Sequence, residues 1–211
     1  MVDTSHQFAG LETIYLWIAL AVFICVLTAI LVAVIRYRRR SPTQYPTGKD
    51  ERNLVESFYA FGLVCIAAFL IAATYHVENR VDHVTKNPGL RVNVVAAQWN
   101  WKFIYPGTGV SSFTGASTYP VLTVPTNTEI SFHATSRDVI HSFWIPATRF
   151  KRDVFPHTTT YFDLLFDKPG WFAGECAEFC GLLHSQMRFR VHALPPAQFK
   201  SWLASQKGAA S

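Results

Sequence analysis

The sequence predicts a membrane protein in which a hairpin of two transmembrane helices is followed by an all-β sandwich or barrel. Two observations support this fold class. Residues 14–35 and 57–75 are long apolar runs without a single charged residue. From Asn79 onward the chain changes to short segments rich in β-branched and aromatic residues, separated by turn clusters such as YPGTG and DKPG. Several short strands at such spacing are typical of sandwiches and barrels.

Both apolar runs are long enough to cross a bilayer, whose hydrocarbon core of roughly 30 Å needs about 20 residues of helix. We therefore predict transmembrane helices at 14–35 and 54–76. A buried helix or a signal peptide is the alternative interpretation of the first run. That run is longer than the apolar core of a signal peptide, however, and no basic segment precedes it.

The distribution of basic residues predicts the orientation. The loop at 36–53 contains six of the nineteen Lys and Arg residues, whereas the segment at 1–13 contains none. Basic residues close to transmembrane helices stay on the cytoplasmic side. We therefore expect a cytoplasmic loop at 36–53, an external segment at 1–13 and an external domain at 77–211. The net charge of +5 does not indicate a nucleic-acid partner, because no basic stripe follows a helix face.

The external domain contains several segments with the composition of strands and one helical tail. The expected strands lie at 90–97, 119–124, 128–134, 159–166 and 188–194. The tail at 195–211 is expected to form a short amphipathic helix with Phe199, Trp202 and Leu203 on one side.

The stretch GECAEFCGLLHSQM, residues 174–187, combines Cys176, Cys180, His184 and Met187. In an exported domain the ordinary interpretation of two cysteines is a disulfide. The imidazole and the thioether favour a metal site, because soft sulfur ligands select copper, zinc or iron–sulfur clusters. Zinc has little use for a thioether. A blue-copper centre takes one cysteine only, whereas two thiolates can bridge two copper ions that each need an imidazole.

The second imidazole must come from elsewhere in the domain. We favour His141, which lies in SRDVIHSFWIP at the end of an expected strand. The other candidates are His76, His83, His133, His157 and His192.

These residues resemble subunit II of cytochrome c oxidase, in the haem–copper oxidase superfamily. The similarity extends from the first apolar run to about Leu194, and its most specific part is Cys-x-Glu-x-Cys-x3-His-x2-Met, with HSFWIP upstream. The resemblance implies a cupredoxin-like Greek-key sandwich with a binuclear copper centre called CuA. It also implies that the Glu178 backbone carbonyl contacts copper and that the Glu178 carboxylate faces a magnesium or manganese ion shared with subunit I. The implied copper ligands are His141, Cys176, Glu178, Cys180, His184 and Met187.

A second similarity is QWNWKFIYPG, in which Trp99, Trp101, Phe103 and Tyr105 alternate. Alternation alone predicts a strand with one aromatic core face. In the family the aromatic run lies over the copper site, and its first tryptophan is where electrons enter. The resemblance therefore assigns that role to Trp99. We further expect an apolar shell around the metal made of Trp99, Phe143, Trp144 and Phe179.

Glu56 lies at the expected cytoplasmic start of the second helix, where a carboxylate is costly unless it faces protein or water. An interfacial acid without further function is one interpretation. The family often has a glutamate at this point, at the entrance of a proton pathway into subunit I. The chain departs from the family pattern at Tyr59, where tryptophan is common, and at His157, where glycine is usual.

The resemblance implies partners and a location. The partners are subunit I, subunit III, the lipid membrane and a cytochrome c or membrane-bound cytochrome c domain as donor. The chain contains no C-x-x-C-H sequence, so we expect no covalent haem, and oxygen reduction coupled to proton pumping is expected on subunit I. The short N-terminal segment favours the plasma membrane of a bacterium over the mitochondrial inner membrane.

Several alternatives stay open at this point. A CuA-containing subunit of a nitric oxide reductase would have the same motif. A membrane-anchored copper-binding or delivery protein would need exposed ligands, and a structural zinc domain would leave Met187 unused. A quinol oxidase subunit would lack the copper ligands.

Overall fold

The computed structural model describes residues 4–38, 52–113 and 119–209. The chain forms two compact units, one of residues Ala9–Glu78 and one of residues Met1–Phe8 with Asn79–Ser211. Most of the loop predicted at 36–53 lies outside the described residues, as do the first three residues of the segment predicted at 1–13.

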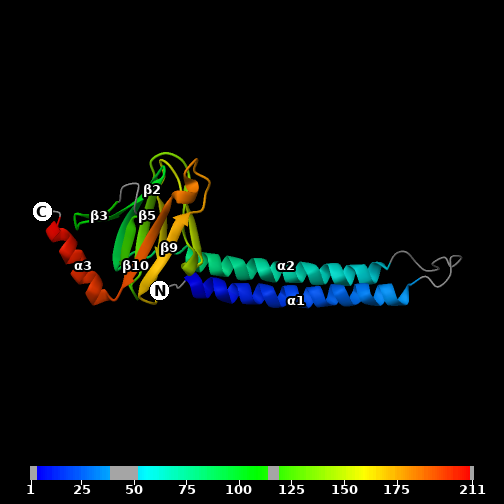
Figure 1. The fold of residues 1–211 in the computed structure, drawn as a ribbon. Coiled ribbons are helices and arrows are strands. Elements are labelled where there is room, and N and C mark those ends of the chain that lie inside the picture. Colours follow the sequence, from blue (N-terminus) through cyan, green and yellow to red (C-terminus); the bar gives the residue numbers. More distant parts are fainter. Residues whose placement is uncertain (1–3, 39–51, 114–118, 210–211) are drawn as a thin grey trace. The chain divides into compact units, whose positions relative to one another are not determined.

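The helical unit is built from α1, Thr4–Arg36, and α2, Asn53–Val81. Each helix continues past the predicted apolar run, because the flanking residues contain no proline that would break the hydrogen-bond ladder. Both helices are long and apolar enough to cross a membrane, and their apolar stretches are exposed. The two run side by side (Figure 1), and the Tyr15 hydroxyl lies 2.7 Å from Thr74 Oγ1.

The described part of the second unit contains ten strands in two five-stranded sheets. The first sheet has the order β3-β2-β1-β5-β8. Its strands are β1 Leu90–Ala97, β2 Asn100–Tyr105, β3 Val110–Ser112, β5 Ile130–Ser136 and β8 Thr160–Leu164. The second sheet has the order β4-β10-β9-β6-β7. Its strands are β4 Val121–Pro125, β6 His141–Ile145, β7 Phe150–Val154, β9 Gly170–Cys176 and β10 Arg188–Leu194.

The sheets pack face to face, which confirms the predicted helical hairpin followed by a β-sandwich (Figure 1). β1 pairs with β5 and β4 pairs with β10 in parallel, while the other pairs are antiparallel. Two short 3-10 turns, Pro146–Thr148 and His184–Gln186, and the C-terminal helix α3, Pro196–Ala209, complete the unit.

An aromatic core joins the two sheets. Phe143 on β6 stacks on Phe189 of β10 with ring centroids 4.8 Å apart, and Trp101 of the other sheet meets Phe189 edge-on at 5.5 Å. All three side chains are buried. Aromatic pairs add roughly 0.5–1.5 kcal/mol beyond the burial of their area. The strands that carry His141 and Cys176 are therefore fixed by a dense core.

A buried tyrosine fixes the end of the sandwich that is next to α3. The Tyr105 hydroxyl donates to the Thr123 carbonyl at 2.8 Å and accepts from the Thr123 amide at 2.9 Å. Burial, partly offset by the hydrogen bond to Thr123, raises the pKa of Tyr105. Trp202 of α3 lies over Tyr105 with ring centroids 5.4 Å apart, and Phe199 of the same helix is buried.

Strand β9 was not among the expected strands, because its sequence GWFAGEC contains two glycines and reads as weak β structure. Neighbours on both sides hold it, since it pairs with β10 and with β6. At Gly174 the reason for glycine is packing: the ring of Phe189 occupies the space that a side chain would need. Tertiary context therefore overrides local propensity in this strand.

Candidate metal centre

Three strand ends meet at one edge of the sandwich. β9 ends at Cys176, β10 begins directly after Met187, and β6 begins at His141. The pairing of β6 with β9 places Phe143 opposite Cys176. The Cys176 amide donates to the Met187 carbonyl at 3.0 Å, so residues 177–187 form a loop that is closed at its base.

The two thiols lie at the centre of this edge. The Sγ atoms of Cys176 and Cys180 are 3.8 Å apart, and both cysteines are free. A disulfide has an S–S distance of about 2.05 Å, so the structure does not have the disulfide considered as an alternative. Each thiol has its own imidazole: His141 Nδ1 is 3.8 Å from Cys176 Sγ, and His184 Nδ1 is 3.5 Å from Cys180 Sγ.

Each thiol also lies close to one further atom that could act as a weak metal ligand. The Glu178 carbonyl oxygen is 3.2 Å from Cys176 Sγ, and Met187 Sδ is 3.8 Å from Cys180 Sγ. The six residues named from the sequence therefore lie around one pair of thiols. Donor atoms of His141, Cys176 and Cys180 all lie within 4.8 Å of one another, which is compact enough to hold a metal.

The donors are shielded from solvent to different degrees. His141 and Met187 have no exposed surface, Cys180 is 1% exposed and Cys176 is 6% exposed. His184 is half-buried. Two thiolates, two imidazoles and a thioether form a soft ligand set that fits copper, whereas a zinc site would not use the thioether.

The two thiols have opposite pKa shifts. Burial opposes ionisation of Cys176, but hydrogen bonds with His141, with the backbone of Ser142 and Glu178 and with Cys180 outweigh it and lower the Cys176 pKa. Burial, followed by the charge of the Cys176 thiolate, raises the Cys180 pKa. The first proton of the pair therefore leaves readily, and the second requires a cation to compensate the second negative charge.

Asp138 orients one of the imidazoles. Its Oδ1 atom lies 2.8 Å from His141 Nε2, which leaves Nδ1 directed at Cys176. Its other oxygen accepts from the Gln98 amide at 2.6 Å, and the Val139 amide donates to Oδ1 at 2.7 Å. A carboxylate on the far nitrogen of a histidine is the usual support for a metal ligand, because it fixes both tautomer and ring orientation.

The Asp138–His141 contact also shifts the pKa of both groups. Burial favours neutral Asp138, but hydrogen bonds from Gln98, His141 and Val139 outweigh it and lower the Asp138 pKa. Burial likewise favours neutral His141, but its bonds to Cys176 and Asp138 outweigh that effect and raise the His141 pKa. The structure therefore adds Asp138 to the residues of this site, as the carboxylate that contacts His141.

Trp99 lies in the turn between β1 and β2, not on a strand as the alternation predicted. Only Trp101, Phe103 and Tyr105 continue the alternation, and all three are buried. The indole of Trp99 donates to the Cys180 carbonyl at 3.2 Å, and the Gln98 side-chain amide donates to the same oxygen at 2.8 Å. The turn therefore holds the ligand loop directly.

Gly181 allows this close approach. It follows Cys180 with φ +118, a conformation that side chains rarely adopt. A Cβ there would meet the Gln98 amide at 3.1 Å and the Trp99 ring at 3.2 Å. Glycine at this position therefore permits both the positive φ and the close approach of Gln98 and Trp99.

Two residues of the predicted apolar shell do not enclose the thiols. Phe179 contacts the His184 ring, with centroids 5.8 Å apart, but it is 80% exposed. Trp144 is adjacent to the buried Phe143 on β6 and pairs with Glu175, so strand alternation places it on the outer face of the sheet. A loop has no periodicity from which burial can be predicted. The sheet face on which a strand residue lies can be predicted only when the strand boundaries are known.

Glu56 lies in the first turn of α2, where its Oε1 atom accepts from the Arg52 amide at 3.2 Å. Such a bond caps a helix N-terminus. A hollow of about 390 Å³ adjoins it, lined by Asn53, Glu56, Ser57, Tyr59 and Ala60. Glu178 is half-buried.

Comparison with known proteins places this geometry in a family. A family model described as cytochrome c oxidase subunit II, periplasmic domain, matches residues 115–194. The "Probable cytochrome c oxidase subunit 2" of Streptomyces avermitilis is 30% identical over 226 residues, which cover 88% of this chain and 70% of that protein. The chain belongs to the cytochrome c oxidase subunit II family.

Two further similarities agree with the family. Cytochrome c oxidase subunit 2 of Bacillus sp. (strain PS3) is 40% identical over 124 residues, covering 56% of this chain and 33% of that protein. The crystal structure of the periplasmic domain of subunit II from Bradyrhizobium japonicum matches with TM-score 0.54 and 27% identity, covering 61% of this chain and all of that domain. The sandwich is thus the cupredoxin-like external domain of subunit II, and the chain is a subunit of a haem–copper oxidase.

Proposed function

We propose that this chain receives electrons for its oxidase through a binuclear copper centre at the strand ends described above. His141, Cys176, Cys180, His184, Met187 and the Glu178 carbonyl would hold the two ions. The observation behind this proposal is that each of two free thiols, 3.8 Å apart, has its own imidazole and its own weaker donor. Copper held by these residues would supply one-electron exchange with the charge shared over two ions.

The scaffold supports electron transfer better than copper delivery. A delivery protein needs ligands that exchange with a partner, whereas His141, Cys180 and Met187 are almost fully buried. The strand ends, the Asp138 contact and the Trp99 and Gln98 bonds hold the donor atoms in fixed positions. Such preorganisation limits ligand movement when the oxidation state changes.

Trp99 is the residue through which we propose that electrons enter. Its ring is partly exposed and its indole contacts the backbone of Cys180, so it connects the surface to a proposed ligand. The donor would be a cytochrome c or a membrane-bound cytochrome c domain. Electrons would then pass to the haem and copper of subunit I, where oxygen is reduced to water and protons are pumped.

The remaining roles concern the membrane and the neighbouring subunits. We propose that α1 and α2 anchor the chain in the plasma membrane of a bacterium, with the sandwich outside and the 36–53 loop inside. Glu56, beside the hollow of about 390 Å³, would stand at the entrance of a proton pathway. The Glu178 carboxylate would face a magnesium or manganese ion shared with subunit I, and subunit III would complete the assembly.

The test is metal content and electron paramagnetic resonance on the full chain within its purified oxidase. The proposal expects two copper ions for this chain, with one unpaired electron shared equally by both. It also expects reduction of that signal by a reduced cytochrome c before the haems are reduced. One zinc ion, a single copper, or a disulfide between Cys176 and Cys180 would contradict the proposal.

A further inference from the structure

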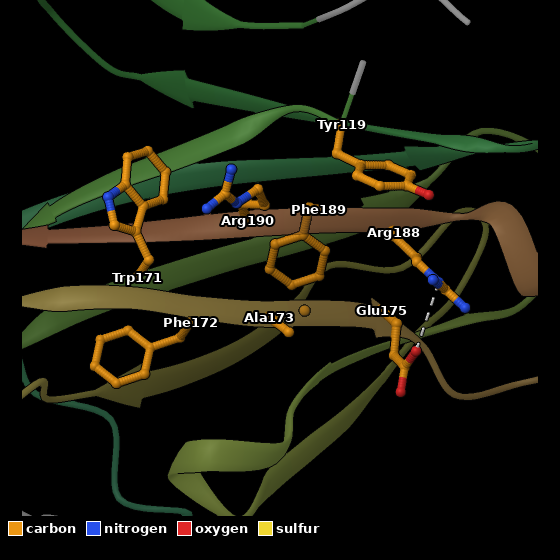
Figure 2. A pocket seen from close by; sticks show the side chains of 9 residues that line it. Tyr119, Trp171, Phe172, Ala173, Glu175, Arg188, Phe189 and Arg190 are labelled. Carbon is orange, nitrogen blue, oxygen red and sulfur yellow. Dashed lines mark ion pairs between the residues drawn. The ribbon is translucent and has the colours of Figure 1, made fainter. Parts of the chain in front are cut away.

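A groove on the outer face of the second sheet is separate from the metal centre. It has a volume of about 480 Å³ and runs along β9 and β10. Figure 2 shows Tyr119 and Trp171 along it, with Arg190 between them and Arg188 towards the end where β9 stops. Glu175 and Arg188 are sequence neighbours of Cys176 and Met187, but strand alternation directs them to the opposite side of the sheet.

Arg190 is held in position by aromatic contacts. Its guanidinium carbon is 4.4 Å from the centre of the Trp171 ring, and that ring also stacks on His192 at 3.9 Å with an angle of 6°. Among the described residues no carboxylate lies within ion-pair distance of Arg190. A stacked guanidinium loses little entropy when it binds a carboxylate through its fork of N–H donors.

Arg188 gives the groove a second cation. It faces Glu175 at 4.0 Å, the outer limit of an ion pair, and both side chains are partly exposed. Arg188 and Arg190 lie two residues apart on one strand, so their side chains repeat at about 7 Å. An extended peptide with acidic side chains at alternate positions presents carboxylates at the same repeat.

The shape of the groove favours a polypeptide over a small molecule. Trp171 is 50% exposed and Tyr119 is 47% exposed. Small-molecule sites enclose most of their ligand, which such an open wall cannot do. Exposed tyrosine, tryptophan and arginine are instead the side chains that contribute most to protein interfaces.

We propose that the β9–β10 groove docks an acidic, extended segment of another protein, with Arg190 and Arg188 binding carboxylates two residues apart. Tyr119 and Trp171 would cover the two flanks of that segment. The proposal does not depend on copper, because no side chain of the groove belongs to the donor set. Copper content, measured in parallel, separates a failure of the groove from a failure of the metal centre.

The binding test uses the full chain in uncharged detergent and fluorescein-labelled hexapeptides of alternating residues. One peptide alternates glutamate with valine, and its control alternates glutamine with valine. We expect fluorescence anisotropy to show binding of the glutamate peptide only, weakening as salt is added. Arg190→Gln should weaken it roughly fivefold, which is the upper range for an exposed ion pair, and Arg190→Lys should weaken it less.

The matched control is Arg91→Gln, because Arg91 is an exposed arginine on β1 in the other sheet. It should leave binding of the glutamate peptide unchanged. Equal binding of both peptides, or equal losses in the two arginine variants, would overturn the proposal. Binding of inorganic phosphate or of phosphatidylglycerol vesicles through Arg190, without binding of the peptide, would assign the groove to a phosphate group and also overturn it.

A second measurement identifies the segment in the assembled oxidase. A photoreactive benzoylphenylalanine replaces Tyr119, and the cross-linked peptide is sequenced by mass spectrometry. The proposal expects a segment with Asp or Glu at alternate positions, lost when Arg190→Gln is added. A segment without acidic residues, or no protein cross-link at all, counts against it.

Discussion

The four cysteines of the chain lie in two regions that place the same side chain in different surroundings. Cys25 on α1 and Cys65 on α2 are exposed, within apolar runs that contain no histidine, methionine or acidic residue. Cys176 and Cys180 are buried, with imidazole, thioether and carbonyl donors within 4 Å. The difference teaches that the fold, and not the thiol itself, supplies the further donor atoms that a metal site would need.

The sharpest test of this comparison removes one thiol from each region. Cys176→Ser or Cys180→Ser should abolish the shared-electron copper signal and slow electron acceptance by more than about 100-fold, exceeding the loss expected for residues that only support ligands. Cys25→Ser and Cys65→Ser should leave both unchanged. Copper content and stopped-flow reduction by cytochrome c measure the effects, and a comparable loss in the helix variants would invalidate the distinction.

The next largest effect concerns Asp138, which orients the proposed ligand His141. Asp138→Asn removes the charge that orients His141, and copper affinity should fall about 10- to 100-fold. Asp138→Glu should recover part of this loss. Asp167→Asn is the control, because Asp167 is exposed and pairs only loosely with Lys168 at 3.7 Å. Chelator competition gives the affinities, and equal effects at Asp138 and Asp167 would show that the orientation is unimportant.

Copper affinity should also depend on pH. Burial and the nearby Cys176 thiolate raise the Cys180 pKa, so the metal-free domain retains a proton there that copper must displace. Protons compete more strongly as the pH falls, and affinity should drop by up to about tenfold per pH unit for each proton released. Competition titrations between pH 8 and pH 6 measure this slope. An affinity that does not change over this range would mean that Cys180 is already ionised.

Packing distinguishes the two regions less strongly. Gly174→Ala would press a methyl group against the Phe189 ring and should lower the free energy of unfolding by about 1–3 kcal/mol. Gly62→Ala in α2 has open space and should change it by less than about 1 kcal/mol. Denaturant unfolding of the full chain in detergent compares the two. Equal stability of the two variants would contradict the close packing of β9.

The smallest expected effect lies within the helical unit. Tyr15→Phe removes the hydroxyl that meets Thr74, and a hydrogen bond between membrane helices contributes about 0.6 kcal/mol on average. Helix association in detergent should weaken by this amount while copper content stays the same. A loss of copper in this variant would show that the hairpin and the metal centre are coupled.

Much of the fold and the site could be predicted because the responsible signals are local. Two long runs without charged residues predicted the two helices, and segments rich in β-branched and aromatic residues predicted strands where β1 and β10 lie. The loop donors Cys176, Cys180, His184 and Met187 were recognisable because they occur within twelve residues of sequence. His141 was favoured among several histidines for its place at a strand end and then by resemblance, since spacing alone does not show which distant strands become neighbours.

The parts that sequence reasoning missed depend on tertiary contacts. The bonds of Gln98 and Trp99 to the Cys180 carbonyl join segments up to 82 residues apart. The exposure of Phe179 depends on how the loop folds above the sheet, which no periodicity describes. β9 was missed because glycine is unfavourable in an isolated strand, whereas Gly174 in the folded domain makes room for the Phe189 ring.

The bond between the Cys176 amide and the Met187 carbonyl has an engineering consequence. β9 and β10 are already in register at Glu175 and Arg188, so the intervening segment can change in length or composition without shifting the ladder below it. The segment is therefore an exchangeable cassette. Grafting it between the same two strands of another sandwich, with a histidine at the start of the adjoining strand, is expected to carry the candidate donors to a new host.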